Sequence, residues 1–236
     1  EPVNDDVLQN HARAERGCVR VRDLAFRVVI LPAVTALPVK TLEFLNRFVE
    51  AGGVLIALEN LPSASVGLKD YREEDQRIQA LVKQLWGANG EGRQHPGGGR
   101  TYFLPEYRIV EPEFTPQEQP WQAPPPLNAA QQKLLQILRE HQPPDVFLPG
   151  FRQSEGIAFL HRRIEDLDLY FVTNLAPNPS EDPLTFRVRG KWPEQWDPFT
   201  GAIRPLNAFR IREGGIEIPL KFEPWASTLI LFRPGP

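Results

Sequence analysis

The chain has 236 residues, 41% of them hydrophobic, and its 27 Lys and Arg against 30 Asp and Glu give a formal net charge of -3. This balance provides no large basic surface for a phosphate backbone, so we expect no nucleic-acid partner. No apolar run approaches the roughly 20 residues that cross a bilayer, so we expect no membrane partner either. The length accommodates two modest domains, each able to bury its own core.

The cysteine and methionine counts limit the chemistry further. Cys18 is the only cysteine, which excludes an internal disulfide and a thiolate-rich metal site, and we expect no metal and no cofactor in this chain. The N-terminal residues 1–4 lack the basic-then-apolar layout of a signal peptide. A sequence without Met predicts processing, or excision from a longer polypeptide.

The first half of the chain begins with a strand–helix–strand pattern. Residues 26–31 form a compact β-branched run that Pro32 stops, as expected of a buried parallel strand. Residues 54–58 form a second such run. Between them, Gly52 and Gly53 end a helix that is predicted by apolar residues at helical spacing: Leu42, Leu45, Phe48 and Val49. This unit predicts two parallel strands joined by a right-handed crossover.

A second amphipathic helix is expected to end at Gly87, with one apolar face made of Ile78, Leu81, Val82, Leu85 and Trp86. The glycines at 97–99 are interpreted as a turn, because no Lys-Ser/Thr follows them as in a phosphate loop. Residues 100–104 are a further predicted strand. The sequence therefore favours an open, mostly parallel three-layer α/β sheet of the flavodoxin or amidotransferase type.

A change of pattern places the domain boundary near Gly150. Residues 105–126 are dense in Pro, Glu and Gln and predict an exposed irregular segment. After it, Asn128 is expected to cap a helix that Pro143 and Pro144 terminate. Residues 1–150 are thus predicted to form the α/β domain, and residues 151–236 a second domain.

The second domain shows short strands with period-two alternation. A hairpin is predicted from residues 157–163 and 169–174, with its turn at 165–168. The Pro and Gly of residues 197–201 predict another turn. Further strands are expected at 184–188, 216–220 and 227–232. An α/β domain followed by a small antiparallel β-sandwich is the predicted architecture.

Several short motifs follow one another in a specific order along the chain: Val3-Asn4-Asp5-Asp6-Val7-Leu8, Val28-Val29-Ile30-Leu31-Pro32, Phe48-Val49-Glu50-Ala51-Gly52-Gly53, Leu85-Trp86-Gly87, Phe159-Leu160-His161-Arg162-Arg163, Tyr170-Phe171-Val172-Thr173-Asn174 and Trp196-Asp197-Pro198-Phe199-Thr200-Gly201. In combination they resemble the region after the catalytic barrel in the α-L-rhamnosidases of glycoside hydrolase family 106. The resemblance runs over nearly the whole chain. Its α/β part is similar also to the trimerisation domain of family 42 β-galactosidases.

The resemblance implies an amidotransferase-like α/β domain and a β-sandwich, both accessory to a barrel that removes terminal rhamnose from plant-type glycans. It implies an upstream catalytic barrel domain as partner and a periplasmic or extracellular location. The family's acid and base carboxylates lie in the barrel, so no catalytic residue is assigned to this chain. Two alternatives stay open: a stand-alone carbohydrate-binding module, and an amidotransferase-like enzyme with Cys18 as its nucleophile.

Two groups of residues are candidates for contact with a glycan. The resemblance puts Asn4, Asp5 and Asp6 at the junction with the barrel, where they are substrate-facing candidates; their alternative role is to cap a helix at Val7 and Leu8.

The other group lies in the predicted sandwich. His161 and Arg163 share one face of a strand and are sugar-binding candidates, with an internal ion pair to Glu165 or Asp168 as the alternative. Trp192 and Trp196 are candidates for stacking on a sugar, with burial in the core as the alternative.

Overall fold

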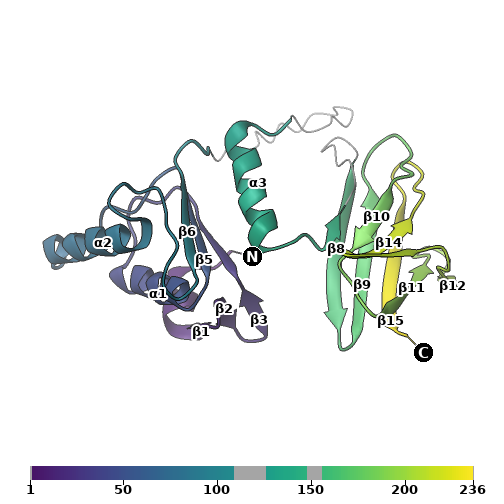
Figure 1. Cartoon of the computed structure of the whole chain (residues 1–236), viewed down its shortest axis with the longest axis horizontal. Helices are drawn as coiled ribbons and strands as arrows, with labels where there is room; N and C mark the ends of the chain where they lie inside the picture. The colour runs from purple at the N-terminus through teal and green to yellow at the C-terminus, as the bar shows by residue number, and fades with distance from the viewer. Residues whose placement is uncertain (1, 109–125, 148–155, 236) are drawn as a thin grey trace. The chain divides into compact units, whose positions relative to one another are not determined.

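The computed structural model describes residues 2–108, 126–147 and 156–235, and these fall into two compact units. The first unit takes residues 2–108 and 127–143, and the second takes residue 126, 144–147 and 156–235 (Figure 1). The predicted boundary near Gly150 lies outside the described residues and stays a prediction. Among the described residues, strands outnumber helices, and one of the four sheets is parallel.

The first unit is built on the parallel sheet, whose strand order is β4-β5-β6. Its elements are β4 (Val28–Leu31), α1 (Val39–Glu50), β5 (Val54–Leu58), α2 (Tyr71–Trp86), β6 (Arg100–Leu104) and α3 (Ala129–His141). The predicted strand–helix–strand pattern is confirmed, because β4 and β5 pair in parallel from Val28 with Val54 to Leu31 with Ala57. A capping box formed by Asn128 and Gln131 begins α3, as the sequence predicted for Asn128.

Strand β5 is buried along its whole length because helices cover both of its faces. Leu55 and Ala57 belong to a core that contains the apolar residues of α1 and α2. Their neighbours Val54 and Ile56 belong to a second core, which contains Ile137 of α3. Alternate residues of one strand thus hold three layers together, with α1 and α2 on one face and α3 on the other (Figure 1).

A small antiparallel sheet precedes the parallel one along the chain. Its strands are β1 (Ala12–Glu15), β2 (Cys18–Val21) and β3 (Leu24–Phe26), in the order β1-β2-β3, and a short π-helix, η1 (Val7–His11), comes before them. Val19 anchors this sheet, since it is almost fully buried in the core that α1 and α2 share. Strand β2 is therefore the central strand of this sheet and carries its most buried side chain.

The glycines before β6 form the turn that the sequence predicted. The amide of Gly98 donates to the carbonyl of His95 at 2.9 Å, which closes the turn. A Cβ at Gly97 would lie 1.6 Å from the carbonyl oxygen of Glu50, and one at Gly99 would lie 1.9 Å from that of Val49. Glycine is needed because the turn packs directly on the C-terminal backbone of α1.

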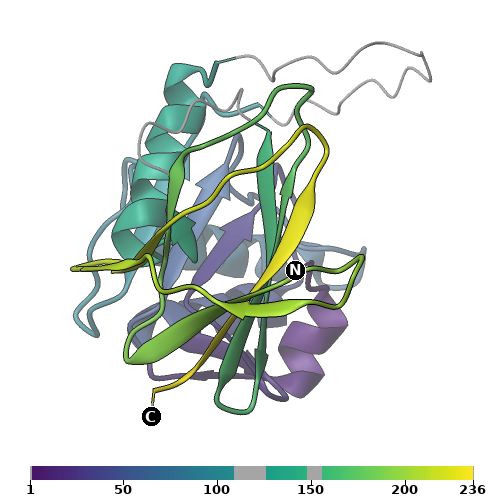
Figure 2. The same ribbon diagram turned by 90° about the vertical axis from the view of Figure 1, so that its right-hand side faces the viewer.

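The second unit contains two antiparallel sheets (Figure 2). One has four strands in the order β13-β14-β10-β7: β7 (Val146–Phe147), β10 (Pro183–Phe186), β13 (Arg210–Arg212) and β14 (Gly215–Pro219). The other has five strands in the order β12-β11-β15-β9-β8: β8 (Ile157–Ile164), β9 (Leu167–Asn174), β11 (Lys191–Trp196), β12 (Ile203–Pro205) and β15 (Ser227–Pro234). Both sheets contribute to one core, in which the rings of Tyr170, Phe186 and Phe232 meet at tilted or edge-to-face angles.

The predicted hairpin is present, but its turn is shorter than expected. Strands β8 and β9 pair from Ile157 with Asn174 to Ile164 with Leu167, which leaves Glu165 and Asp166 as the turn. Glu165 adopts a left-handed conformation (φ 53°), so two residues suffice to reverse the chain. Asp168 consequently lies inside β9 with its side chain nearly buried.

Candidate functional site

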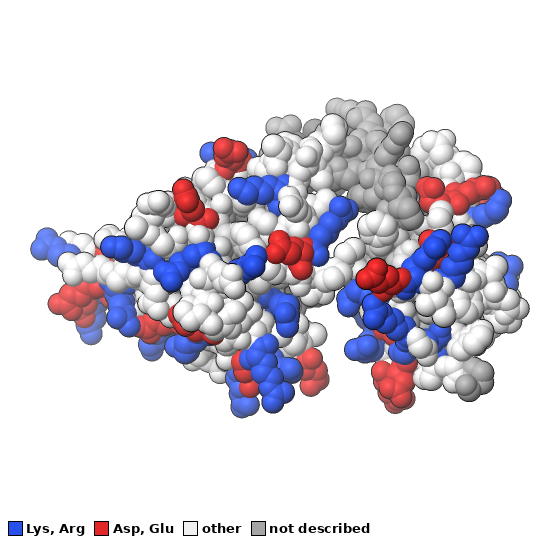
Figure 3. Space-filling view, viewed as in Figure 1, with Lys and Arg blue, Asp and Glu red and all other residues white. Residues whose placement is uncertain are grey.

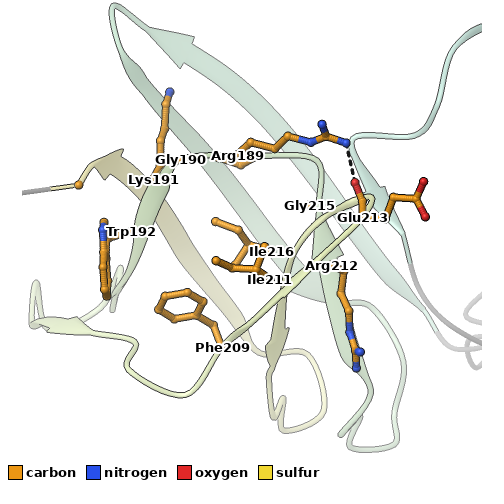
Figure 4. A pocket seen from close by; sticks show the side chains of 12 residues that line it. Arg189, Gly190, Lys191, Trp192, Phe209, Ile211, Arg212, Glu213, Gly215 and Ile216 are labelled. Carbon is orange, nitrogen blue, oxygen red and sulfur yellow. Dashed lines mark hydrogen bonds between the residues drawn. The ribbon is translucent and has the colours of Figure 1, made fainter.

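An apolar cavity of about 710 Å³ lies beside the start of β11 in the second unit. Figure 4 shows the indole of Trp192 and the ring of Phe209 next to each other, with Ile211 and Ile216 beside them. Trp192 and Phe209 meet edge to face at 5.4 Å between ring centroids. Trp192 is 52% exposed, so part of its indole is available to a ligand.

Two glycines shape the wall of this cavity. A Cβ at Gly235 would lie 2.4 Å from Nε1 of Trp192, so the chain after β15 packs against the indole edge. A Cβ at Gly215 would lie 1.9 Å from the carbonyl oxygen of Phe186, and Gly215 has a φ of 147°. Close approach of β14 to β10 therefore requires glycine at position 215. Because Gly215 has no side chain, the cavity remains open beside Ile216.

Three cationic side chains around the cavity already donate hydrogen bonds within the second unit. Lys191 donates to Asp168 at 2.6 Å, and Arg212 donates to Glu217 at 2.9 Å. The hydrogen bond from Arg212 holds the pKa of Glu217 below its usual value. Arg189 donates to the backbone carbonyl of Glu213 at 2.5 Å. The cavity is thus an apolar space whose rim is close to electrically neutral.

A second cluster of polar groups lies around His161 in β8. Its Nδ1 is 3.2 Å from Asp145 and its Nε2 is 2.9 Å from Asp168, so a ring protonated at both nitrogens donates to both carboxylates. The imidazole stacks on the ring of Tyr170 at 4.2 Å, with 4° between the planes. Arg187 forms a further ion pair with Asp145. The cluster therefore joins Asp145, just before β7, to β8 and β9.

Asp168 is the centre of this cluster. Burial acts to raise the pKa of its carboxyl, but hydrogen bonds from Lys191 and His161 outweigh burial, and the pKa is lowered. The side chain is only 6% exposed, and the neighbouring cations compensate its charge. Burial raises the pKa of the adjacent Tyr170, which therefore stays a neutral phenol. Asp168 acts here as a fixed anion.

The structure places the sugar-binding candidates in three different surroundings. His161 and Arg163 both approach Asp168, and Nε of Arg163 lies 3.7 Å from it, so the internal ion pair that the sequence offered as an alternative is present. Trp196 donates to Glu194 at 3.2 Å, and Arg233 lies over its ring. Trp192 lines the cavity, whereas His161 and Arg163 do not.

The three N-terminal candidates make contacts within the first unit. Asn4 accepts from the amide of Val7 at 3.0 Å, which is the capping role that the sequence offered as an alternative. Asp5 accepts from Thr41 of α1 at 2.7 Å, and Asp6 accepts from Asn10 at 2.9 Å. Asn4 also lines an apolar cavity of about 550 Å³ together with Pro2, Val3, Val7, Val21, Leu24 and Phe26.

Cys18 lies at the start of β2, opposite Glu15 in a β-hairpin, and is half-buried. It does not stand at a strand-to-helix elbow, the position an amidotransferase-type nucleophile needs. Within residues 2–108, 126–147 and 156–235, no group of three or more His, Cys, Asp and Glu side chains is arranged to hold a metal ion. The same residues contain no helix with the length and apolarity needed to span a membrane.

Sequence reasoning missed several residues of these sites. Ile211 and Arg212 belong to β13, an exposed three-residue strand that has no alternation long enough to recognise, and Phe209 lies directly before this strand. Asp145 follows two prolines in a segment expected only to end a helix. A charged residue directly before an apolar pair, Val146 and Phe147, was the available signal that a short strand begins there.

Comparisons with known proteins find a family model that matches part of the chain and solved structures with a similar fold. A family model described as α-L-rhamnosidase, glycoside hydrolase family 106, matches residues 126–211. A protein of Formosa agariphila with the provisional name beta-glucuronidase is 28% identical over 78 residues, which is 33% of this chain and 7% of that protein.

Among solved structures, a rhamnosidase from Novosphingobium sp. PP1Y matches 99% of this chain with a TM-score of 0.75 and 21% identity. Gan42B, a GH42 β-galactosidase of G. stearothermophilus, matches 88% of this chain with a TM-score of 0.51 and 12% identity. Both likenesses concern the fold. The chain spans 20% of the first structure and 32% of the second.

Proposed function

Because the chain carries a glycoside hydrolase region of the family 106 α-L-rhamnosidase type, as its motifs predicted, we propose that it is a non-catalytic accessory part of an enzyme that removes terminal rhamnose. In this proposal the first unit is an amidotransferase-like α/β domain and the second a small β-sandwich. The catalytic barrel is a further domain of the parent protein and the main partner of this chain.

One observation carries the proposal. Nearly the whole chain matches one fifth of a rhamnosidase, so its two units correspond to a minor share of that larger protein. Helix α3 and the strands β7 to β12 of the second unit fall within the family match, which supports a rhamnosidase parent over the β-galactosidase that the fold also resembles. The parent's activity and glycan are part of the proposal.

The electrostatics of the second unit agree with an accessory role. Glycoside hydrolysis uses two facing carboxyl groups, one of which has a raised pKa so that it can protonate the leaving group. Asp145 and Asp168 face each other across His161, but the imidazole lies between them, and the pKa of Asp168 is lowered. Asp168 therefore has no proton to offer a glycosidic oxygen.

An activity assay tests the proposal. We expect the 236-residue chain to release no rhamnose or nitrophenol from an aryl α-L-rhamnoside, and the parent protein with its barrel to release both. Turnover that rises with the concentration of the chain and survives repeated purification would overturn the accessory role. A gene whose reading frame upstream of the codon for Glu1 encodes no barrel would overturn the identity of the partner.

The carbohydrate-binding alternative is favoured by one specific observation, the half-exposed Trp192 in an apolar cavity. An accessory unit that binds sugar and one that only supports a barrel are compatible functions. The amidotransferase-like alternative has no comparable support, because Cys18 lies in a hairpin of the small N-terminal sheet. Replacement of Cys18 by Ser should leave any measured activity of the parent protein unchanged.

A further inference from the structure

The cavity beside β11 has the composition of a small-ligand site. Ligand pockets are mostly apolar and include a few polar groups that fix orientation, and aromatic side chains supply much of their contact area. Here Trp192 and Phe209 form an aromatic corner, while Ile211 and Ile216 form an aliphatic surface beside it. All four side chains lie in one unit, in strands or connections held by the shared core of the two sheets.

The aromatic corner suits the ring of a sugar. A pyranose has hydroxyl groups at its edges and C–H groups on its faces, and the exposed part of the Trp192 indole offers an apolar surface of matching size. The indole is held in place at its edge by Phe209 and by the chain at Gly235. A fixed aromatic ring loses little conformational entropy when a ligand binds.

The charges around the cavity favour an uncharged sugar over a uronic acid. Lys191 and Arg212 are each paired with a carboxylate outside the cavity, Asp168 and Glu217. In Figure 4 the charged ends of Lys191, Arg212 and Glu213 point away from the apolar side chains. A carboxylate placed against Trp192 and Ile211 would lose its hydration, and Lys191 and Arg212 already have carboxylate partners.

The aliphatic surface favours a sugar that lacks the hydroxyl at C6. A hydroxymethyl group placed against Ile211 and Ile216 would have to give up a hydrogen bond to water unless another donor or acceptor replaces it. A methyl group in that position would gain by burial of its carbon. A 6-deoxyhexose satisfies both the aromatic corner and this surface.

We propose that the cavity lined by Trp192, Phe209, Ile211 and Ile216 binds a neutral 6-deoxyhexose, of the rhamnose type, at the end of a glycan chain. This inference rests on the proposed function for the identity of the sugar and adds a second binding site, in the β-rich unit and distinct from any barrel. Polar groups at the rim, with Arg189 and Glu213 on one side, contact the ring hydroxyls. The site holds the glycan and does not cleave it.

Titration calorimetry of the 236-residue chain with methyl α-L-rhamnoside, methyl α-L-mannoside and galacturonic acid tests the proposal. The mannoside differs from the rhamnoside only by the hydroxyl at C6. We expect the rhamnoside to bind with a Kd on the order of 1 mM, as for a small site with one stacking ring, and about tenfold more tightly than the mannoside. Galacturonic acid should not bind.

Matched variants assign the binding to the cavity. Trp192→Ala should weaken rhamnoside binding at least tenfold, and Trp192→Phe should retain part of it. Trp225→Ala is the control, because Trp225 is 59% exposed in the same unit and does not line the cavity. A circular dichroism spectrum and a melting curve for each variant show whether the fold is kept.

Each outcome decides between the proposals. Equal binding of rhamnoside and mannoside, or undiminished binding by a folded Trp192→Ala variant, overturns the inference. An absence of rhamnoside binding by the unaltered chain also overturns it, and leaves the accessory role standing if no turnover occurs. Hydrolysis of the rhamnoside by the chain overturns the proposed function instead, while the effect of Trp192→Ala on binding still judges the cavity.

Discussion

The two units differ in how they accommodate a buried ionisable side chain. In the first unit the buried His95 has its Nε2 3.0 Å from the backbone carbonyl of Leu85, and burial lowers the pKa of its ring, so it is held as a neutral group. In the second unit the nearly buried Asp168 stays charged, because Lys191 and His161 surround it. One unit thus excludes charge from its interior, and the other compensates it with neighbouring charge.

The reason lies in the sheets. Both faces of the parallel sheet are covered, and at its margin the carbonyl of Leu85 also accepts a hydrogen bond from Thr101. In the second unit, Lys191 and Asp168 lie at or near the ends of their strands and His161 lies within β8, and the hydrogen bonds of Asp168 with Lys191 and His161 join the three strands. On the face that Figure 3 shows, acidic and basic side chains are interspersed. The contrast leads to four predictions.

The largest effect is expected in the two separate cores. Phe48 and Phe232 are both fully buried, Phe48 in the first unit and Phe232 in the second. Replacement of either by Ala should cost about 3–5 kcal/mol of unfolding free energy, through lost burial and a cavity. Hydrogen exchange measured by mass spectrometry should then accelerate only in the unit that carries the substitution. Faster exchange in both units would show a single cooperative core.

The ion cluster is expected to have the next largest effect. Asp168→Asn removes the anion that compensates Lys191 and His161, and should cost about 2–3 kcal/mol in urea unfolding at pH 7. Because the pKa of Asp168 is lowered in the folded state, its contribution is present above about pH 3.8 and is lost as the pH falls through the folded value.

Asp166→Asn is the matched control, since Asp166 lies exposed in the adjacent turn and only its backbone carbonyl accepts from Lys191. It should change stability by no more than about 0.5 kcal/mol. Equal effects of the two substitutions would mean that the buried cluster adds nothing to stability.

A smaller effect is expected from His95, in a different pH range. The unfolded chain binds a proton at this site below about pH 6.5, whereas the folded chain resists it, so stability should fall as the pH drops from about 6.5 toward the lowered folded pKa. His95→Gln keeps a donor for Leu85 and removes the titration. The variant should show a shallower loss of stability with acid, by up to about 1.4 kcal/mol per pH unit.

Melting curves between pH 5 and 7.5 measure this difference. If stability depends on pH equally steeply in the unaltered chain and in His95→Gln, the buried ring of His95 is not held neutral.

The smallest effects are expected at exposed ion pairs, where the two units should behave alike. Arg77 pairs with Glu43 at 3.1 Å in the first unit, and Lys221 pairs with Glu181 at 2.8 Å in the second. Arg77→Ala and Lys221→Ala should each cost less than about 1 kcal/mol, and 1 M NaCl should remove most of that in urea unfolding. A loss similar to that of Asp168→Asn would show that burial is not what distinguishes the cluster.

The sequence predicted the parts of the fold that periodicity determines. The stripe of Leu42, Leu45 and Phe48 gave α1, and the β-branched runs on either side gave two parallel strands, because burial on both faces leaves few other patterns. The glycoside hydrolase region was predicted from the family resemblance, because no periodic pattern in the sequence identifies such a region. The sheet-rich character of the second unit followed from its alternation and turns.

The sites were less predictable because they depend on contacts between distant residues. His161 and Arg163 were recognised as candidates, but Asp145 and Lys191 lie 16 and 23 residues away from their partners in the cluster, and no local pattern connects them. Of the two aromatic residues that line the cavity, Trp192 was identified as a candidate from the sequence. The other, Phe209, precedes an exposed strand that looks like a loop in the sequence.

The late position of α3 in the chain has a consequence during protein synthesis. Helix α3 covers the face of the parallel sheet formed by Val54, Ile56 and Leu104. A ribosome that adds about 5–20 residues per second needs roughly 2–7 s to proceed from the end of β6 to the end of α3. Throughout that interval the nascent sheet presents an uncovered aliphatic surface, which is the kind of segment that a chaperone near the exit tunnel recognises.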